Sequence, residues 1–184
     1  MTEPRKTPLI DDRYMALAWI YAGFSKDPNT QVGAQIIGEN NYPLGAGYNG
    51  PPRKMDDNKI PWHRPSADNP EEYCKYDVTT HAERNAIRHT NRLGSGKSLI
   101  GSTLYITALP CPPCMLFLVE EEIKRVIYCD FQSDSDSSLQ NQAWKKKSFN
   151  IAKDGGIELI KYEGNISWLQ EWIKIIEQKN PYIF

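Results

Sequence analysis

The chain has 184 residues, of which 40% are hydrophobic and 11% aromatic, a composition that excludes intrinsic disorder and fits one globular domain. Its 22 Lys and Arg are balanced by 23 Asp and Glu, so the formal net charge is -1 and a large basic face for duplex nucleic acid is not expected. No apolar run approaches the roughly 20 residues that cross a bilayer, and the charged start has no signal-peptide core, so we expect an unprocessed cytoplasmic protein without a membrane partner.

The first half of the chain is predicted to form a helix, a hairpin and a long loop. Apolar spacing and turn residues predict a helix over 11–24, a turn over 25–30, a buried strand over 32–37, a hairpin turn at 39–41 and a second strand over 43–48. Residues 49–77 hold five prolines and three aromatic residues. An unstructured loop of this length is usually functional.

In the second half, predicted helices and strands alternate. They are helices over 79–91, 112–121, 144–153 and 167–178, and strands over 103–108, 125–129 and 157–160, with a polar loop or helix cap at 133–138. Thr79 or Thr80 is expected to cap the first of these helices, with Glu83 closing a capping box. A hairpin followed by this alternation predicts an α/β fold, a three-layer α/β/α sandwich around a mixed sheet.

We expect one domain over 1–184, with a core over about 11–162 and a helical extension over about 163–184. The extension has an apolar stripe formed by Trp168, Leu169, Trp172, Ile173 and Ile176. This stripe favours a helix that caps the core, and a subunit contact is the alternative.

Two short motifs carry the chemistry: His81-x-Glu83 and, later, Pro-Cys111-Pro-Pro-Cys114. Two thiolates three residues apart at a helix start can hold one Zn²⁺, and the helix N-terminus favours the thiolate form. His81 adds a third ligand. Three protein ligands are typical of a catalytic zinc site, which keeps a position for water, whereas structural zinc is closed by four.

Glu83 is predicted to be the catalytic proton carrier. It lies about 200° round an ideal helix from His81, so both can reach one water only at the first turn of a helix. Zn²⁺ lowers the pKa of bound water to roughly 7, and a carboxylate that is not a ligand can carry the proton to a ring nitrogen and a leaving amine. His-x-Glu followed by Pro-Cys-x-x-Cys is the described signature of zinc deaminases, which hydrolyse an amidine-like carbon such as C4 of cytosine.

Residues of these types also have other uses in proteins. Cys111 and Cys114 can form a redox pair, but their surroundings are not thioredoxin-like. A structural zinc site needs a fourth ligand from among His63, Cys74, His89 and Cys129. His89 lies roughly 12 Å along the helix from His81, and Cys129 is expected to be a buried small hydrophobe. A second metal site in the long loop remains open.

The chain resembles the deoxycytidylate (dCMP) deaminases of the cytidine deaminase superfamily. The matching stretches are 25–34, 47–50, 61–64, 81–87 and 103–114, within roughly residues 13–130. Histidine as the first ligand separates the chain from the nucleoside cytidine deaminases, which usually have cysteine there. Asn85 in His-Ala-Glu-x-Asn-Ala is more typical of the dCMP group than of tRNA adenosine or guanine deaminases.

The resemblance implies a five-stranded sheet, a homo-oligomer (hexamer or dimer) and a set of site residues. The implied metal ligands are His81, Cys111 and Cys114, with Glu83 as proton shuttle. The implied substrate contacts are the Ala82 backbone at the base carbonyl, Asn49 at the sugar or phosphate, and Ser25 and Lys26 at the 5′-phosphate.

Three departures from the family pattern concern the substrate phosphate and regulation. Phe24 stands where the family usually has a basic residue, which removes a phosphate contact. The run 51–57 replaces a Gly-Cys pair and an Asp that help bind a regulatory nucleoside triphosphate with Mg²⁺, so Mg²⁺ is expected only if such a site exists. The run 131–133 replaces an aromatic residue of the family. Arg84 and Arg53 are candidates to compensate, or are plain surface residues.

The sequence therefore predicts a zinc-dependent hydrolase that converts dCMP to dUMP and ammonia. The first alternative, supported by Phe24, is deamination of another nucleobase, a nucleoside or a modified cytosine nucleotide. An editing deaminase acting on a polynucleotide is disfavoured by the near-neutral charge. An inactive zinc-binding domain is disfavoured because Glu83 is intact.

Overall fold

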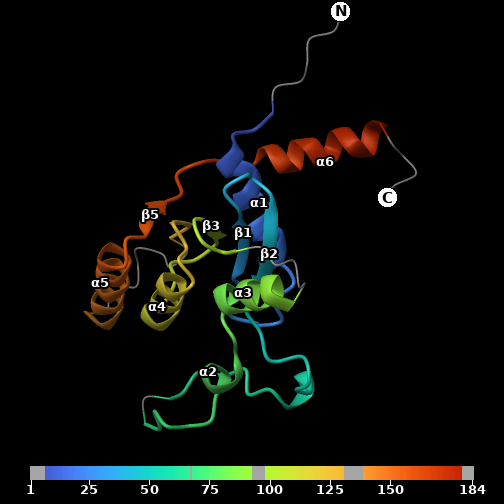
Figure 1. Ribbon diagram of the computed structural model, residues 1–184. Helices are drawn as coiled ribbons and strands as arrows, with labels where there is room; N and C mark the ends of the chain where they lie inside the picture. Colours follow the sequence, from blue (N-terminus) through green and yellow to red (C-terminus); the bar gives the residue numbers. More distant parts are fainter. Residues whose placement is uncertain (1–6, 67, 93–97, 131–138, 180–184) are drawn as a thin grey trace, which may run out of the picture.

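The computed structural model describes residues 7–66, 68–92, 98–130 and 139–179 (Figure 1). In chain order the elements are α1 (Ile10–Ala22), β1 (Gly33–Ile37), β2 (Pro43–Tyr48), the 3-10 helix η1 (Asp57–Lys59), α2 (Lys75–Val78), α3 (Ala82–Arg92), β3 (Thr103–Ile106), α4 (Pro112–Glu120), β4 (Arg125–Tyr128), α5 (Leu139–Asp154), β5 (Glu158–Lys161) and α6 (Trp168–Lys179). The predicted run 133–138 lies outside the described residues.

The five strands form one mixed sheet in the order β2-β1-β3-β4-β5. Strand β1 is antiparallel to both β2 and β3, whereas β3, β4 and β5 run parallel. Parallel neighbours need a crossover between them, and α4 and α5 provide those two crossovers. The predicted five-stranded mixed sheet is confirmed.

Successive side chains of the central strands point to opposite faces of the sheet, as the two-residue period of a strand requires. One face packs under α3, α4 and α5 and includes Ile36, Leu104, Ile106 and Val126. The other face packs on α1 and includes Ile37, Tyr105 and Ile127 against Met15 and Ala18. The two apolar layers make the predicted three-layer α/β/α arrangement.

Helix α3 lies unusually close to β2 because β2 presents glycines to it. A Cβ on Gly47 would be 2.4 Å from the Ala86 nitrogen, and one on Gly45 would be 2.7 Å from the Ala86 carbonyl oxygen. Only a residue without a side chain permits this approach. The glycines therefore fix the position of α3 and of the His-x-Glu motif at its start.

Helix α3 begins later than the sequence predicted. The Thr80 N–H and C=O both bond to Gly50, at 2.9 and 3.0 Å, in an isolated antiparallel bridge. The helix starts at Ala82, so the predicted cap at Thr79 or Thr80 and its capping box with Glu83 are wrong. The bridge to Gly50 takes the backbone groups of Thr80 and delays the helix by three residues, from the predicted residue 79 to Ala82.

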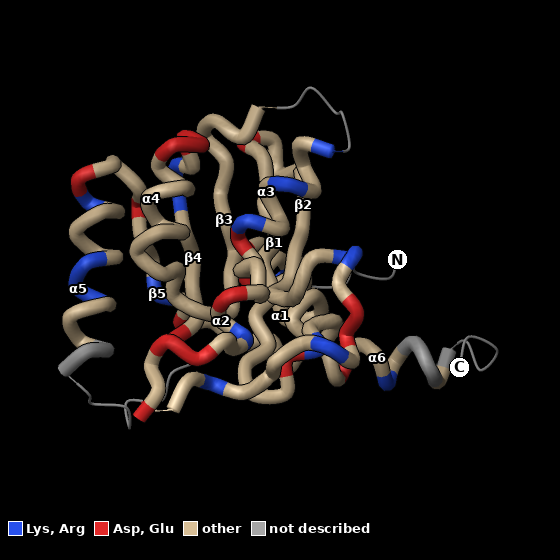
Figure 2. Tube along the Cα trace, turned by 90° about the horizontal axis from the view of Figure 1, so that it is seen from below, with Lys and Arg blue, Asp and Glu red and all other residues tan. Residues whose placement is uncertain are grey.

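The long segment between β2 and α3 is more ordered than predicted, since it contains η1 and α2. In Figure 1 it extends below α3, away from the sheet. Figure 2, which views the molecule from this side, shows basic and acidic residues interspersed rather than a single basic face. This agrees with the near-neutral charge of the chain.

The C-terminal helix α6 lies beside the start of α1 and projects from the body (Figure 1). Helix α6 and residues 7–12 line one hollow, and the expected role of this helix as a cap on the core stays a prediction. Within the described residues, no helix is long and apolar enough to cross a membrane.

Candidate active site

His81, Cys111 and Cys114 come together at the starts of two helices. His81 immediately precedes α3, Cys111 immediately precedes α4, and Cys114 lies in the first turn of α4. The His81 Nδ1 atom lies 3.4 Å from each of the two Sγ atoms. Among the side chains that the structure describes, these three form the one such group, with ligand atoms within 4.8 Å of one another.

The spacing of these donor atoms fits a zinc ion. A tetrahedral ion with Zn–S near 2.3 Å and Zn–N near 2.0–2.1 Å places its nitrogen and sulfur ligands about 3.6 Å apart. The observed 3.4 Å is close to that value. One imidazole and two thiols also form a donor set that Zn²⁺ prefers, and three ligands leave a coordination position open.

Local sequence explains why the two cysteines are placed this way. Pro112 and Pro113 occupy the first positions of α4, where a missing N–H costs no helical hydrogen bond and a fixed φ suits the helix. Cys111 and Cys114 then lie at the positive end of the helix dipole, which stabilises thiolates.

Neighbouring side chains in this group shift one another's pKa values. The hydrogen bond from Cys114, together with His81, lowers the pKa of the Cys111 thiol to about 4. The pKa of Cys114 is raised because its proton is held by Cys111 and the side chain is buried, and the pKa of His81 is raised by its hydrogen bond with Cys111. A bound cation releases such protons, since ligands bind deprotonated.

Glu83, in the first turn of α3, is only 3% exposed. Burial raises the pKa of its carboxyl, an effect that the nearby His81 partly opposes. A carboxyl whose pKa lies above its usual range can accept a proton and return it near neutral pH. Glu83 thus has the properties of a general acid–base group and stands outside the metal-binding group.

A cavity of about 310 Å³ joins these groups, a size typical of small-molecule sites, which start at about 300 Å³. His81, Glu83 and Cys111 line it together with Ala82. Its apolar and aromatic lining consists of Val32, Tyr76, Ala108, Leu109 and Trp144. Its polar lining consists of Asp27, Thr30, Asn49, Arg64, Lys75 and Thr79.

Asn49 follows β2 and lines this cavity with most of its amide already engaged. Its Oδ1 accepts the Val32 N–H at 2.8 Å, and its Nδ2 donates to the Thr30 carbonyl at 2.9 Å. These bonds fix the side chain, and one N–H of the amide is left for a ligand.

Ser25 and Lys26 do not line the cavity. The Ser25 hydroxyl donates to the Asn49 carbonyl at 2.8 Å and accepts the Asp27 N–H. The Lys26 ammonium forms an exposed ion pair with Asp57. The structure therefore does not place these two residues in the cavity wall, and the phosphate contact that the family resemblance implied for them stays a prediction.

Asp27 and Lys75 form a buried ion pair in the cavity wall that the sequence reasoning missed. Lys75 Nζ lies 2.8 and 3.0 Å from the two Asp27 oxygens, and the side chains are 3% and 2% exposed. Asp27 also accepts the N–H groups of Asn29 and Thr30. The pair joins the 25–30 turn to α2. The signal for this ion pair in the sequence was Lys75 itself, which lies six residues before His81.

The remaining histidines and cysteines have other surroundings. His63 faces Glu72 at 3.5 Å, His89 Nδ1 lies 3.0 Å from the Ala46 carbonyl, and Cys129 contacts Met15. All four cysteines are free thiols, and Cys74 is buried. Neither a fourth metal ligand nor a second metal group is present among the described residues.

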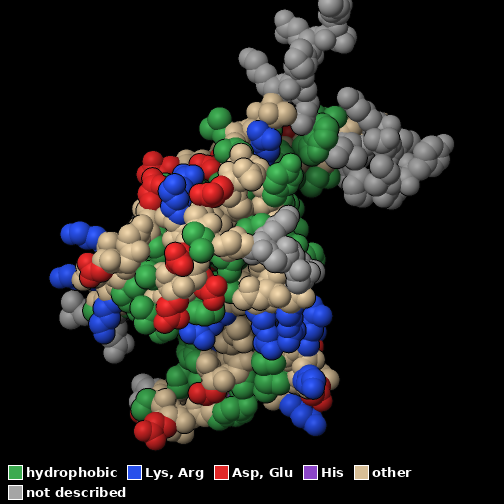
Figure 3. Space-filling view, viewed as in Figure 1, with side chains coloured by type: hydrophobic (Ala, Val, Ile, Leu, Met, Phe, Trp, Pro, Cys, Tyr) green, Lys and Arg blue, Asp and Glu red, His purple; other side chains and the backbone are tan. Residues whose placement is uncertain are grey.

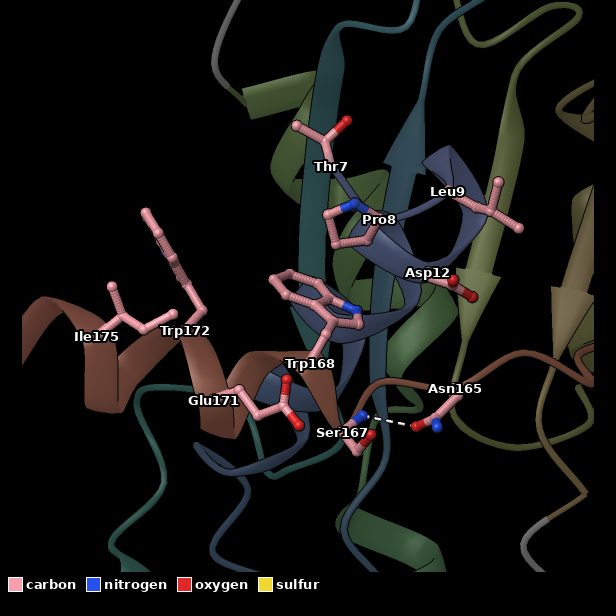
Figure 4. A pocket seen from close by; sticks show the side chains of 10 residues that line it. All are labelled: Thr7, Pro8, Leu9, Asp12, Asn165, Ser167, Trp168, Glu171, Trp172 and Ile175. Carbon is pink, nitrogen blue, oxygen red and sulfur yellow. Dashed lines mark hydrogen bonds between the residues drawn. The ribbon is translucent and has the colours of Figure 1, made fainter. Parts of the chain in front are cut away.

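A second hollow of about 490 Å³ lies between residues 7–12 and α6. Figure 4 shows Trp168 and Trp172 rising from α6 there, with Trp168 beside Pro8. Ser167 donates its backbone N–H to the Asn165 side chain at 2.7 Å (Figure 4). None of the predicted site residues lines this hollow.

A model of the cytidine and deoxycytidylate deaminase zinc-binding region matches residues 9–130. Human deoxycytidylate deaminase is 39% identical over 126 residues, which are 68% of this chain and 67% of that protein. The mouse deoxycytidylate deaminase is 37% identical over 139 residues, 76% of this chain and 73% of that protein.

The fold also matches solved structures. The dCMP deaminase from the cyanophage S-TIM5, crystallised in complex with dCMP and dUMP, superposes with a TM-score of 0.62. The superposition covers 86% of this chain and 100% of that chain at 24% sequence identity. At that identity the match establishes the fold.

Proposed function

Because this chain belongs to the cytidine and deoxycytidylate deaminase family, we propose that it is a zinc-dependent hydrolase that converts dCMP to dUMP and ammonia. The observation that carries the proposal is the shared cavity, in which a His-Cys-Cys donor group stands beside a buried carboxyl. The homology to deoxycytidylate deaminases supports the cytosine nucleotide as substrate.

In the proposed reaction, His81, Cys111 and Cys114 hold Zn²⁺, which supplies the Lewis acidity that makes water a nucleophile at neutral pH. Glu83 removes a proton from the attacking water and delivers it to N3 of the cytosine ring. Glu83 then transfers the second proton to the amino group, the C4–N bond breaks and ammonia leaves, so that C4 carries a carbonyl oxygen. The raised pKa of Glu83 suits both transfers.

The other residues of the cavity orient the base and sugar. Ala82 is the first residue of α3, where backbone N–H groups have no intrahelical partner and can donate to the base carbonyl. The remaining Asn49 N–H can donate to the sugar. Leu109 and Trp144 provide apolar surface against which a ring can pack while water is excluded.

The test is the release of ammonia by the zinc-loaded protein from dCMP, CMP, deoxycytidine, cytosine, adenosine and guanine. We expect the highest kcat/KM for dCMP. Turnover of another base, with no reaction of any cytosine nucleotide, would contradict the proposal. The alternative is deamination of another nucleobase, a nucleoside or a modified cytosine nucleotide, and Phe24 supports it. This residue, which stands where the family usually has a basic one, is 56% exposed and packs against Tyr21 and Tyr48 outside the cavity.

We also propose a cytoplasmic homo-oligomer, a hexamer or dimer, on the strength of the family resemblance. Light scattering on the purified protein measures the assembly, and a monomer at micromolar concentration contradicts it. Mg²⁺ belongs to the proposal only with a regulatory nucleoside triphosphate. Loss of triphosphate response on Mg²⁺ removal would establish that requirement.

A further inference from the structure

Arg64 is a cation in the cavity lining without a partner among the described residues. Its side chain comes from the long segment between β2 and α3, and it forms no hydrogen bond or ion pair with any residue that the structure describes. Arg64 is exposed whereas Glu83 is buried, so Arg64 lies at the open rim of the cavity and the carboxyl at its base.

The other cations near the site are neutralised or lie elsewhere. Lys75 shares the lining, but both oxygens of Asp27 balance its charge. Lys26 is paired with Asp57. The exposed arginines of α3 do not line the cavity; basic side chains gather over this helix in Figure 3, and Arg84 stacks on Phe117. Neither does Arg53.

The backbone just before Arg64 is held by the buried Asp27–Lys75 unit. The Lys75 N–H donates to the His63 carbonyl at 3.2 Å. Asn29, whose own N–H bonds to Asp27, donates its side-chain N–H to the Trp62 carbonyl at 3.4 Å. The ion pair thereby fixes the chain just before Arg64, so the guanidinium starts from a positioned backbone.

A second polar group in the lining also lacks a partner. The Thr79 hydroxyl is buried and has no hydrogen-bond partner within the described part of the chain. A buried hydroxyl without a partner costs free energy unless a ligand or water satisfies it. The cavity lining therefore contains an exposed charge and a buried hydroxyl, neither of which is satisfied by the described part of the chain.

We propose that Arg64 binds the 5′-phosphate of the substrate and makes the enzyme select nucleoside monophosphates over nucleosides. The inference rests on the proposed function and assigns the phosphate contact to the long loop instead of Ser25 and Lys26. A guanidinium binds phosphate oxygens through two parallel N–H donors. It also supplies the positive charge that Phe24 does not.

The test compares Arg64→Gln with Lys26→Gln, a matched loss of one positive charge just outside the cavity. For each variant, kcat/KM is measured with dCMP and with deoxycytidine. A hydrogen-bonded charge contact predicts that Arg64→Gln lowers the dCMP value about 10- to 100-fold, leaves deoxycytidine nearly unchanged and is partly rescued in Arg64→Lys. Lys26→Gln is expected to leave the ratio of the two substrates as in the wild type.

Binding of dUMP and deoxyuridine to the zinc-loaded proteins, measured by calorimetry, gives the same comparison without turnover. A selective loss in Lys26→Gln, or an equal loss for both ligands in Arg64→Gln, overturns the inference. If the wild type deaminates dCMP and Arg64→Gln is unaffected, only the Arg64 assignment is wrong. If the wild type deaminates no cytosine nucleotide, the proposed function itself is wrong.

Discussion

Replacing Lys75 with methionine tests the buried ion pair in the cavity wall. Methionine keeps most of the apolar stem and removes the ammonium, which leaves the Asp27 carboxylate 2% exposed without its counter-ion. Breaking a buried pair by removing one partner costs about 3–5 kcal/mol. Asp27 keeps the two N–H bonds from Asn29 and Thr30, so we expect a loss at the lower end of that range, about 3 kcal/mol of the free energy of unfolding.

The assay is urea unfolding of the zinc-loaded protein at pH 7, followed by tryptophan fluorescence. The double variant Asp27→Asn/Lys75→Met removes both charges and is expected to be more stable than Lys75→Met alone, because no buried charge is left unpaired. We also expect Lys75→Met to raise the KM for dCMP, because the ion pair no longer positions the Lys75 N–H and the Asn29 amide that hold the chain before Arg64. A loss below about 1 kcal/mol in Lys75→Met, the value of an exposed pair, would refute the reasoning.

Three further predictions concern the metal group and the helix that carries Glu83. Glu83→Gln should lower kcat by at least about 10³-fold, since one group makes both proton transfers, with zinc content by metal analysis unchanged; substantial residual turnover contradicts the assignment. In chelator-treated protein, iodoacetamide should modify Cys111 down to about pH 5, because the pKa of its thiol is lowered to about 4. Cys129 should stay unmodified at pH 8, because burial raises the pKa of its thiol to about 11. Mass spectrometry measures both modifications, and bound zinc should protect Cys111. Gly47→Ala should lower both the melting temperature and zinc retention, because its Cβ would be 2.4 Å from the Ala86 nitrogen; unchanged values would show that α3 can move away freely.

The sheet and its layers could be read from the sequence because they depend on local periodicity. Ile36 and Ile37, adjacent in a β-branched run, point to opposite apolar layers. The start of α3 could not be read in the same way. Thr80 has the chemistry of a helix cap, but its bridge partner Gly50 is thirty residues away in the sequence and decides its conformation.

The candidate site also has features that the sequence predicted and features that it did not. Short spacing places Cys111 and Cys114 on one helical turn, and His81 comes beside them because the starts of α3 and α4 meet. The contact of Arg64 with the cavity was missed, since it depends on a loop path set by Asp27 and Lys75. Nothing in the sequence indicated that Asp57 pairs with Lys26.

The sequence by itself determined the order of the strands and of the longer helices, the donor residues and the carboxyl beside them, because each depends on residue types at close spacing. Only the tertiary structure decided which polar side chains remain available to a ligand. That depends on partners far apart in the chain, such as Asp27 with Lys75 and Ser25 with Asn49. A charge or hydroxyl that is already satisfied by the protein cannot be recognised from its own position in the sequence.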